Sequence, residues 1–283
     1  MKIKSVLIFY NGYRGLMLST YLRSKGYNVF NVITKKYLHE DILKIAPKKN
    51  VKFIRNLNNK KLIQFIKSKK FNLIISAGFP HIFKPNFFNL STYGILNLHA
   101  GRLPKYRGGS PLVWQIINNE KKIGISIIKI NKGIDTGNIV CSASFLNNKN
   151  DNIFSVQMKA NKKFLKLTLT AIKNLEKGKK FLKQPKSKSY FRQRNDKDAR
   201  INFHQSNIDI FNFVRSQDFP YKGAYFFLKK KKFRLLKCKI SRLNPNLKSG
   251  CTFFKNGNKY IKCKKNSIRL LKTNPELKKN ETI

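Results

Sequence analysis

The sequence predicts an α/β fold in which a parallel sheet with helices is followed by a smaller β-rich module. Three observations lead to this prediction. Residues 5–34 read strand, helix, strand, an order that favours a parallel pair with a right-handed crossover. A later buried strand ends beside glycines and polar side chains, where open α/β sheets carry their ligands. From residue 224 onward, short apolar stretches alternate with turns, as in small β-barrels.

The N-terminal half contains apolar runs separated by segments with helical spacing. We expect strands at Ser5–Tyr10, Asn28–Thr34, Val51–Ile54 and Phe71–Gly78. We expect helices at Leu16–Ser24, within Lys35–Lys49, at Lys60–Ser68 and at Pro85–Leu90. Gly12 and Gly15 alone do not form the G-x-G-x-x-G pattern of a dinucleotide loop, so we expect no nucleotide cofactor there.

Asn97 and His99 lie in the most informative stretch of the chain. They follow the apolar residues Tyr93–Leu96, which predict a short strand. Because they are two residues apart, their side chains are expected to project from the same face of that strand. A turn-rich segment containing Pro104 and two glycines comes next, as expected at the edge of a sheet.

Asp135 follows the apolar run Ile123–Ile130, on a loop between Gly133 and Gly137. An amide, an imidazole and a carboxylate together supply an oxyanion donor, a proton acceptor near neutral pH and a group that orients it. A lone His is often structural, however, and an Asp between glycines is often only a turn residue. The residue types alone leave both interpretations open.

The rest of the chain divides into a sheet-covering part, a linker and a β-rich end. Helices are expected at 110–119, 152–176 and 208–215, and strands at 123–130, 138–145, 224–228, 233–240, 252–254, 259–263 and 267–271. The segment between the long helix and residue 201 is polar, basic and marked by Pro185. We therefore predict a catalytic domain at 1–180, a linker at 181–200 and a C-terminal module at 201–283.

The 283-residue chain carries a net charge of +49, which taken alone points to a polyanionic partner such as RNA or a membrane surface. Because the lysines are spread along the whole chain, this charge decides little. The four cysteines show no C-x-x-C spacing, so no metal site is expected. No apolar run of about 18 residues and no signal peptide is visible, so we expect a cytoplasmic protein without a membrane partner.

The run NLHAGRLPKYRGGSPLVWQIIN, followed by GISIIKINKGIDTG, resembles the folate-dependent formyltransferases. Their core pattern is Asn-x-His, Leu-Pro-x-x-x-Gly and a later Asp-x-Gly, and all three parts are present in order. The turn Pro220-Tyr221-Lys222-Gly223-Ala224 is similar to the turn that opens the family's C-terminal module. The resemblance implies a Rossmann-like parallel-sheet formyltransferase domain followed by a small OB-like β module.

The resemblance also implies roles for individual residues. Asn97, His99 and Asp135 would be catalytic, and the formyl donor would be 10-formyltetrahydrofolate, with no metal. The residues expected to bind the folate are Gly78, Phe79, Ile82, Leu103, Pro104 and Gly133. One departure is that Gly101 and Arg102 stand where the family often has Ser and Leu, which affects the contacts of this loop.

The acceptor of the formyl group is left open between several amines. Methionyl-tRNA formyltransferases carry a basic insertion after the second strand, whereas the segment from Thr34 to Asn50 is short here. We therefore favour an amino sugar on a nucleotide, with methionyl-tRNA as the alternative and glycinamide ribonucleotide as a third candidate. A non-catalytic RNA- or folate-binding relative is a different class, and it would not need three polar groups around one pocket.

Overall fold

The computed structural model describes residues 1–34, 40–186 and 189–277. Packing divides them into two compact units that interleave along the chain. The first unit holds the described residues of 1–108, 124–145 and 158–190, and the second holds 109–123, 146–157 and the described residues from 191 onward. Each unit is described separately below.

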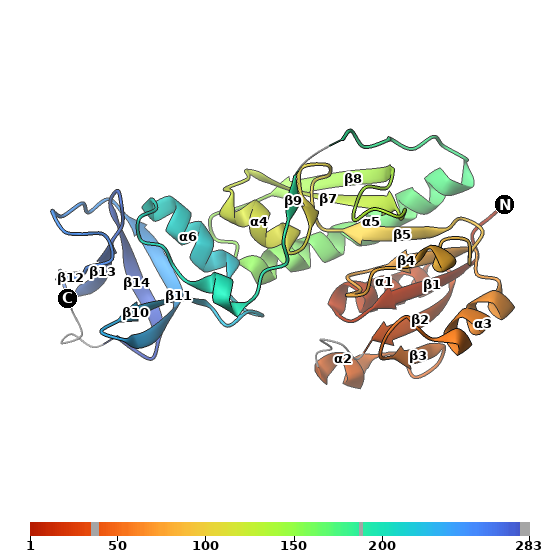
Figure 1. The fold of residues 1–283 in the computed structure, drawn as a ribbon, viewed down its shortest axis with the longest axis horizontal. Coiled ribbons are helices and arrows are strands. Elements are labelled where there is room, and N and C mark those ends of the chain that lie inside the picture. The colour runs from red at the N-terminus through yellow and green to blue at the C-terminus, as the bar shows by residue number, and fades with distance from the viewer. Residues whose placement is uncertain (35–39, 187–188, 278–283) are drawn as a thin grey trace. The chain divides into compact units, whose positions relative to one another are not determined.

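A seven-stranded sheet forms the first unit (Figure 1). Its strands are β1 (Ser5–Tyr10), β2 (Asn28–Thr34), β3 (Val51–Ile54), β4 (Leu73–Ser76), β5 (Ile95–His99), β7 (Lys122–Lys129) and β8 (Ile139–Leu146). They lie in the order β3-β2-β1-β4-β5-β7-β8. The first five pair in parallel, which confirms the predicted parallel sheet. Strand β7 runs antiparallel to β5, so the complete sheet is mixed.

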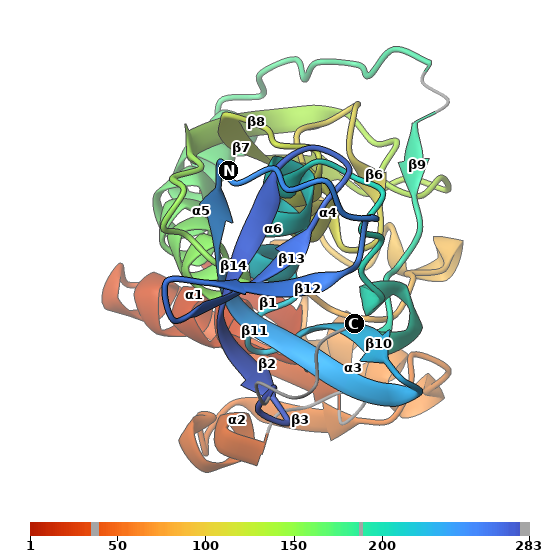
Figure 2. The ribbon, with the colours of Figure 1, turned by 90° about the vertical axis from the view of Figure 1, so that its left-hand side faces the viewer.

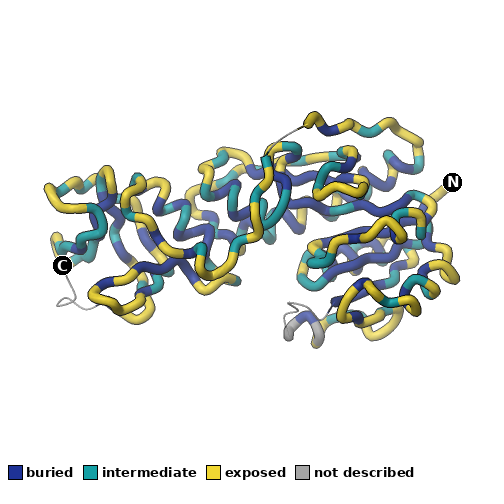
Figure 3. Tube along the Cα trace, viewed as in Figure 1, coloured by how far each residue is buried: buried dark blue, intermediate teal, exposed yellow. Residues whose placement is uncertain are grey.

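Helices cover both faces of this sheet. They are α1 (Tyr13–Ser24), α2 (Glu40–Ile45), α3 (Lys60–Lys69) and the long α5 (Ile153–Glu176), with the 3₁₀ turn η1 (Pro85–Phe87). Leu7 shares one core cluster with Leu62 and Ile66 of α3. Tyr10 points to the other face, where it contacts Gly15 at the start of α1. This alternation follows from the two-residue period of a strand, and Figure 3 shows most of these strands as buried.

Strand β5 lies between β4 and β7, and because β7 is antiparallel, the β7–β8 loop begins beside Ile95 and Leu96. The register places Asn97 opposite Ser76 of β4 and opposite Ile128 of β7. The short pair β6 (Arg107–Gly108) and β9 (Tyr190–Phe191) follows in the chain. The predicted helix within Lys35–Lys49 appears as α2, and residues 35–39 lie outside the described part of the chain.

The second unit is built on a five-stranded antiparallel sheet (Figure 2). Its strands are β10 (Ala224–Leu228), β11 (Lys231–Ser241), β12 (Thr252–Lys255), β13 (Asn258–Lys262) and β14 (Ser267–Asn274), and its helical segments are α4 (Pro111–Ile117), η2 (Asp196–Ala199) and α6 (Asn207–Ser216). Ile210 and Val214 of α6 join the core of this sheet. The five predicted strands are confirmed. Their order, β10-β11-β14-β13-β12, is that of an open sheet rather than a closed ring among the described residues.

Residues 109–123 and 146–157 belong by packing to the second unit, although the sequence assigned them to a domain ending at 180. The division into a catalytic domain at 1–180, a linker at 181–200 and a module at 201–283 concerns function and stays a prediction. Among the helices in the described part of the chain, none has the length and apolar character needed to cross a membrane.

Candidate active site

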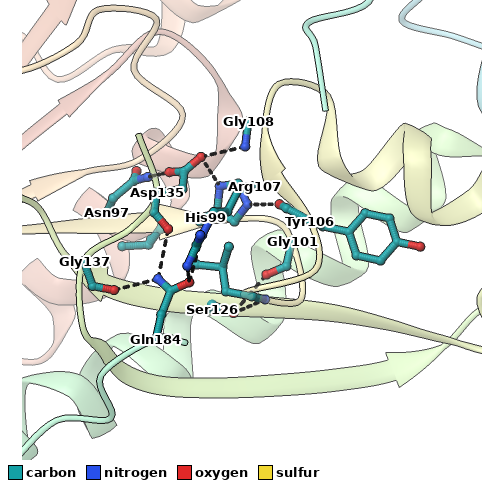
Figure 4. Close-up of polar contacts among 12 residues, drawn as sticks. Asn97, His99, Gly101, Tyr106, Arg107, Gly108, Ser126, Asp135, Gly137 and Gln184 are labelled. Atoms are coloured by element: carbon teal, nitrogen blue, oxygen red, sulfur yellow. Dashed lines mark hydrogen bonds and ion pairs between the residues drawn. The ribbon is translucent and has the colours of Figure 1, made fainter. Parts of the chain in front are cut away.

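Asn97, His99 and Asp135 converge in the first unit, at the carboxyl end of β5 (Figure 4). Asn97 Nδ2 donates a hydrogen bond of 3.2 Å to Asp135 Oδ1. His99 Nδ1 lies 3.4 Å from the other carboxylate oxygen, Oδ2. The alternation of β5 brings the two strand residues to one face, and the β7–β8 loop carries Asp135 to them. The proximity expected from the sequence is therefore present.

The ring of His99 is held in one orientation by the loop that follows β5. Its Nε2 lies 2.6 Å from the main-chain oxygen of Tyr106. Because a carbonyl oxygen can only accept, Nε2 carries a hydrogen. Nδ1 faces Asp135 Oδ2, a second acceptor, to which it can donate only when the ring is protonated. Burial lowers the pKa of His99, an effect opposed by the Asp135 carboxylate and the Tyr106 carbonyl and reinforced by the Arg14 guanidinium. The net direction is downward, which favours the neutral ring.

The carboxylate of Asp135 has three partners. Beside Asn97 and His99, it accepts a 3.0 Å hydrogen bond from the backbone N–H of Gly108. Asp135 has a φ of 52°, in the left-handed region that Asp and Asn tolerate better than most residues. Its side chain is 12% exposed, so it meets both the buried imidazole and the exterior.

The loop that carries Asp135 is closed by contacts of its neighbours. Lys129 N donates to Asn138 O at 3.0 Å, and Asn131 Oδ1 accepts from Gly133 N and from Thr136 Oγ1. At Gly137 a Cβ would lie 1.6 Å from the carbonyl oxygen of Lys129, so the two backbone segments touch where only glycine fits. These contacts close the loop on itself without using the Asp135 side chain.

Two further residues enclose this group: Arg107, which the sequence offered as a contact for anionic substrate, and Gln184, which sequence reasoning did not identify. Gln184, from the predicted linker, donates from Nε2 to the main-chain oxygens of Asp135 (2.9 Å) and Gly137 (2.6 Å). Its Oε1 accepts from Arg107 Nε (3.2 Å) and Nη2 (2.8 Å). We call Asn97, His99, Arg107, Asp135 and Gln184 the polar cluster. A single Gln in a polar, basic segment has no periodicity that could have revealed it.

Gly101 leaves room for the His99 ring. A Cβ at this position would lie 2.5 Å from His99 Nε2 and 2.6 Å from Tyr106 O, the two atoms of the hydrogen bond that orients the ring. Ser126 Oγ holds the same turn, donating to Gly101 O and accepting from Leu103 N. The departure from the family pattern at Gly101 thus coincides with the tightest approach around His99.

The residues expected to bind folate lie on three loops. Gly78 lies two residues after β4 and has a φ of 75°. The atom nearest to a Cβ there would be Arg14 Nη1, which also donates to Leu98 O between Asn97 and His99. We call Gly78–Phe83 the aromatic loop: the Phe79 ring packs edge-on against Phe9, and Ile82 is 73% exposed.

The other three expected folate residues lie nearer the polar cluster along the chain. Leu103 is buried, its peptide bond to Pro104 is cis, and both belong to the turn that Ser126 holds. Gly133 is exposed in the Asp135 loop. Within the described residues no group of three or more His, Cys, Asp or Glu side chains could hold a metal ion. The arrangement instead combines an amide donor, a neutral imidazole and a carboxylate.

Comparisons with known proteins bear on this chemistry. The family model described as formyl transferase matches residues 23–172, more than half of the chain, and the model of the formyl transferase C-terminal domain matches residues 194–283. The bifunctional polymyxin resistance protein ArnA of Wigglesworthia glossinidia brevipalpis is 32% identical over 92% of this chain, which spans only 41% of that protein. The methionyl-tRNA formyltransferase of Malacoplasma penetrans is 29% identical, with 75% of this chain and 67% of that protein covered.

Among solved structures, the fold is similar to that of an N-formyltransferase from Helicobacter canadensis, solved with folinic acid and dTDP-3-aminofucose. The TM-score is 0.72 at 21% identity, and the match covers 95% of this chain and 98% of that one. The fold and both family models agree with the motif read from Asn97 to Asp135. The chain belongs to the formyl transferase family.

Proposed function

We propose that this protein transfers a formyl group from 10-formyltetrahydrofolate to a primary amine, and that the amine belongs to an amino sugar on a nucleotide. One observation carries the formyl-transfer part: in a member of this family, Asn97 donates a hydrogen bond to Asp135 and His99 Nδ1 lies 3.4 Å from the same carboxylate, with His99 buried and Asp135 partly exposed. A protein that only bound folate or RNA would not need this group.

Asn97 is the proposed oxyanion donor. One Nδ2 hydrogen is directed to Asp135 Oδ1, which leaves the second for the formyl oxygen as the amine attacks the formyl carbon. Oxyanion donors of this kind contribute about 3 kcal/mol to catalysis. The intermediate collapses when the carbon's bond to N10 of the folate breaks, which yields tetrahydrofolate and the N-formyl product.

His99 and Asp135 are proposed to carry the proton that the amine loses. The lone pair of Nδ1 takes the proton, and Asp135 Oδ2 at 3.4 Å then stabilises the positive charge of the protonated ring. The leaving N10 then takes up one proton. Its release from the ring, directly or through water, restores the neutral His99.

The folate is proposed to bind against Gly78, Phe79 and Ile82 of the aromatic loop, and against Leu103, Pro104 and Gly133. The high exposure of Ile82 supports this role, because an apolar side chain without protein neighbours is available to a flat ligand. The φ of Gly78 disfavours a side chain there, so backbone can approach the ligand closely.

A sugar nucleotide is our preferred acceptor because the chain passes from Thr34 to Val51 without an insertion rich in proline, glycine and arginine. A small acceptor with two phosphates needs few basic contacts, and the Helicobacter canadensis enzyme was solved with such a molecule. Methionyl-tRNA is the second candidate, since several relatives bear the name methionyl-tRNA formyltransferase and the chain is strongly basic.

The test is to incubate the full-length protein with 10-formyltetrahydrofolate and either a dTDP-amino sugar or charged initiator tRNA, across a range of salt. The His99→Ala variant is the control for non-enzymatic transfer. We expect formylated sugar and a shallow salt dependence. Binding of tRNA would instead weaken by roughly one logarithmic unit of slope per phosphate contact. Rapid, salt-sensitive formylation of tRNA without sugar product contradicts the sugar acceptor, and transfer to neither contradicts the proposed function.

A further inference from the structure

Gln184 uses its whole hydrogen-bonding capacity inside the polar cluster. Its two amide hydrogens go to the main-chain oxygens of Asp135 and Gly137, and its oxygen accepts twice from Arg107. A side-chain amide has two donor hydrogens and two acceptor lone pairs, so all four are paired. If the amide were rotated by half a turn, Oε1 would face two carbonyl oxygens and Nε2 would face the Arg107 guanidinium. Neither pair can form a hydrogen bond, so the partners determine the amide orientation.

The position of Gln184 is itself anchored. Two residues earlier, Leu182 and Ile139 of β8 exchange backbone hydrogen bonds of 2.8 and 3.2 Å. Gln184 is buried, although Lys183 and Pro185 on either side are exposed. The chain therefore turns this one side chain inward from a segment that is otherwise at the surface.

The two partners of Gln184 lie on two separate segments of the chain. The first is the Asp135 loop, through the backbone oxygens of Asp135 and Gly137. The second contains Arg107, which directly follows Tyr106, whose carbonyl orients His99, and directly precedes Gly108, whose N–H binds Asp135. One amide thus joins the segment that orients the imidazole to the loop that carries the carboxylate.

We propose that Gln184 is a positioning residue of the formyl-transfer site, which sets the separation of His99 and Asp135 by joining the Asp135 loop to the Arg107 segment. This inference rests on the proposed function. Gln184 need not touch substrate for this role. Because proton transfer depends on the geometry of Nδ1 and Oδ2, a small displacement of either segment changes the reaction more than it changes the binding of folate.

Two variants separate the two ends of this connection. Gln184→Leu removes both ends, whereas Gln184→Glu keeps an acceptor for Arg107 but sets a carboxylate against the carbonyls of Asp135 and Gly137. Asn174→Leu is the matched control. Asn174 of α5 also donates from a side-chain amide to a backbone carbonyl in the first unit, that of Val140, and it has no bond to the polar cluster. This control therefore removes a hydrogen bond from a side-chain amide to a backbone carbonyl that has no role in positioning His99 and Asp135.

The first measurement is steady-state kinetics of the full chain, with the acceptor that reacts fastest in the test above. We expect kcat of both Gln184 variants to fall by about 10- to 100-fold, with the KM for 10-formyltetrahydrofolate within about twofold of wild type. Asn174→Leu is expected to keep the wild-type kcat even if its midpoint of thermal unfolding falls as far as that of the Gln184 variants. An unchanged kcat in Gln184→Leu overturns the proposal, as does an equal loss in the control.

The second measurement needs no substrate, so it separates failure of this inference from failure of the proposed function. In protein labelled with ¹⁵N-histidine, the His99 signals are identified by their loss in His99→Ala. We expect the Nδ1 signal to move or divide in Gln184→Leu and to stay in place in Asn174→Leu. If it stays in place in all variants, Gln184 does not position His99, whether or not the protein transfers formyl groups.

Discussion

The polar cluster is centred on β5 and the aromatic loop follows the adjacent strand β4, yet the two are built differently. In the polar cluster, each side chain has at least one named hydrogen-bond partner, and the bonds connect three separate chain segments. In the aromatic loop the rings of Phe79 and Phe83 pack against each other and Phe79 packs against Phe9, one side-chain hydrogen bond joins His81 to Thr34, and Ile82 is largely exposed.

This difference matches two physical demands. Proton transfer requires fixed distances, which directional hydrogen bonds provide. Binding a flat ring requires area, which apolar side chains provide without strict direction. Mutations in the polar cluster should therefore affect turnover, and mutations in the aromatic loop should affect affinity. The predictions below test this separation, beginning with the largest effect.

Removal of the acid–base group is expected to have the largest effect. His99→Ala or Asp135→Asn should lower kcat by about two to four orders of magnitude, the usual contribution of a positioned proton acceptor. Steady-state kinetics and a thermal melt check this together. His204→Ala, which removes an exposed imidazole from the second unit, is the matched control and should leave kcat unchanged. Full activity in either site variant would remove that residue from the mechanism.

Crowding of the His99 ring is expected to be the next largest. Gly101→Ala places a Cβ 2.5 Å from His99 Nε2 and 2.6 Å from Tyr106 O, too close to both, so the ring must move and kcat should fall by about 100-fold. Gly12→Ala is the control, because a Cβ there meets no atom within 4 Å. If Gly101→Ala retains wild-type kcat, the ring orientation that Tyr106 imposes is not needed for turnover.

A change in the aromatic loop should appear in KM alone. Ile82→Ala is expected to raise the KM for folate by about 50-fold, since the three aliphatic carbons that it removes contribute about 2.4 kcal/mol when buried by the ligand, while kcat stays the same. Ile45→Ala, which truncates another exposed isoleucine, is the control and should leave the KM for folate unchanged. A fall in kcat without a change in KM would erase the distinction between the two regions.

The smallest effect is a shift in the titration of His99. Since burial lowers its pKa, its NMR midpoint should lie below 6.5, and Asp135→Asn should move it lower still because the carboxylate opposes the shift. At a pH between the lowered pKa of folded His99 and 6.5, the imidazole is protonated in the unfolded chain but not in the folded one. The neutral His99 therefore contributes fully to stability above pH 6.5, and this contribution is lost as the pH falls from 6.5 to the lowered pKa. A midpoint above 6.5 would contradict the neutral base.

The sequence predicted the parallel strands and the convergence of Asn97, His99 and Asp135, because both depend on local patterns: apolar periodicity and the end of a strand. It did not predict the antiparallel β5–β7 pair, since apolar runs carry no direction. It also assigned Gln184 to a linker and could not identify the carbonyl of Tyr106, because every residue has a carbonyl. Such contacts arise only once distant segments meet.

The closed Asp135 loop has a consequence for how this site can change over generations. Its closure uses Lys129, Asn131, Thr136 and Asn138, together with glycines, and none of these bonds involves the Asp135 carboxylate. Architecture and chemistry are therefore assigned to different side chains within one short segment. A different residue at position 135 that tolerates the left-handed backbone would leave the bonds that close the loop in place. Substitutions there can therefore change the chemistry of the site without first removing the contacts that shape the loop.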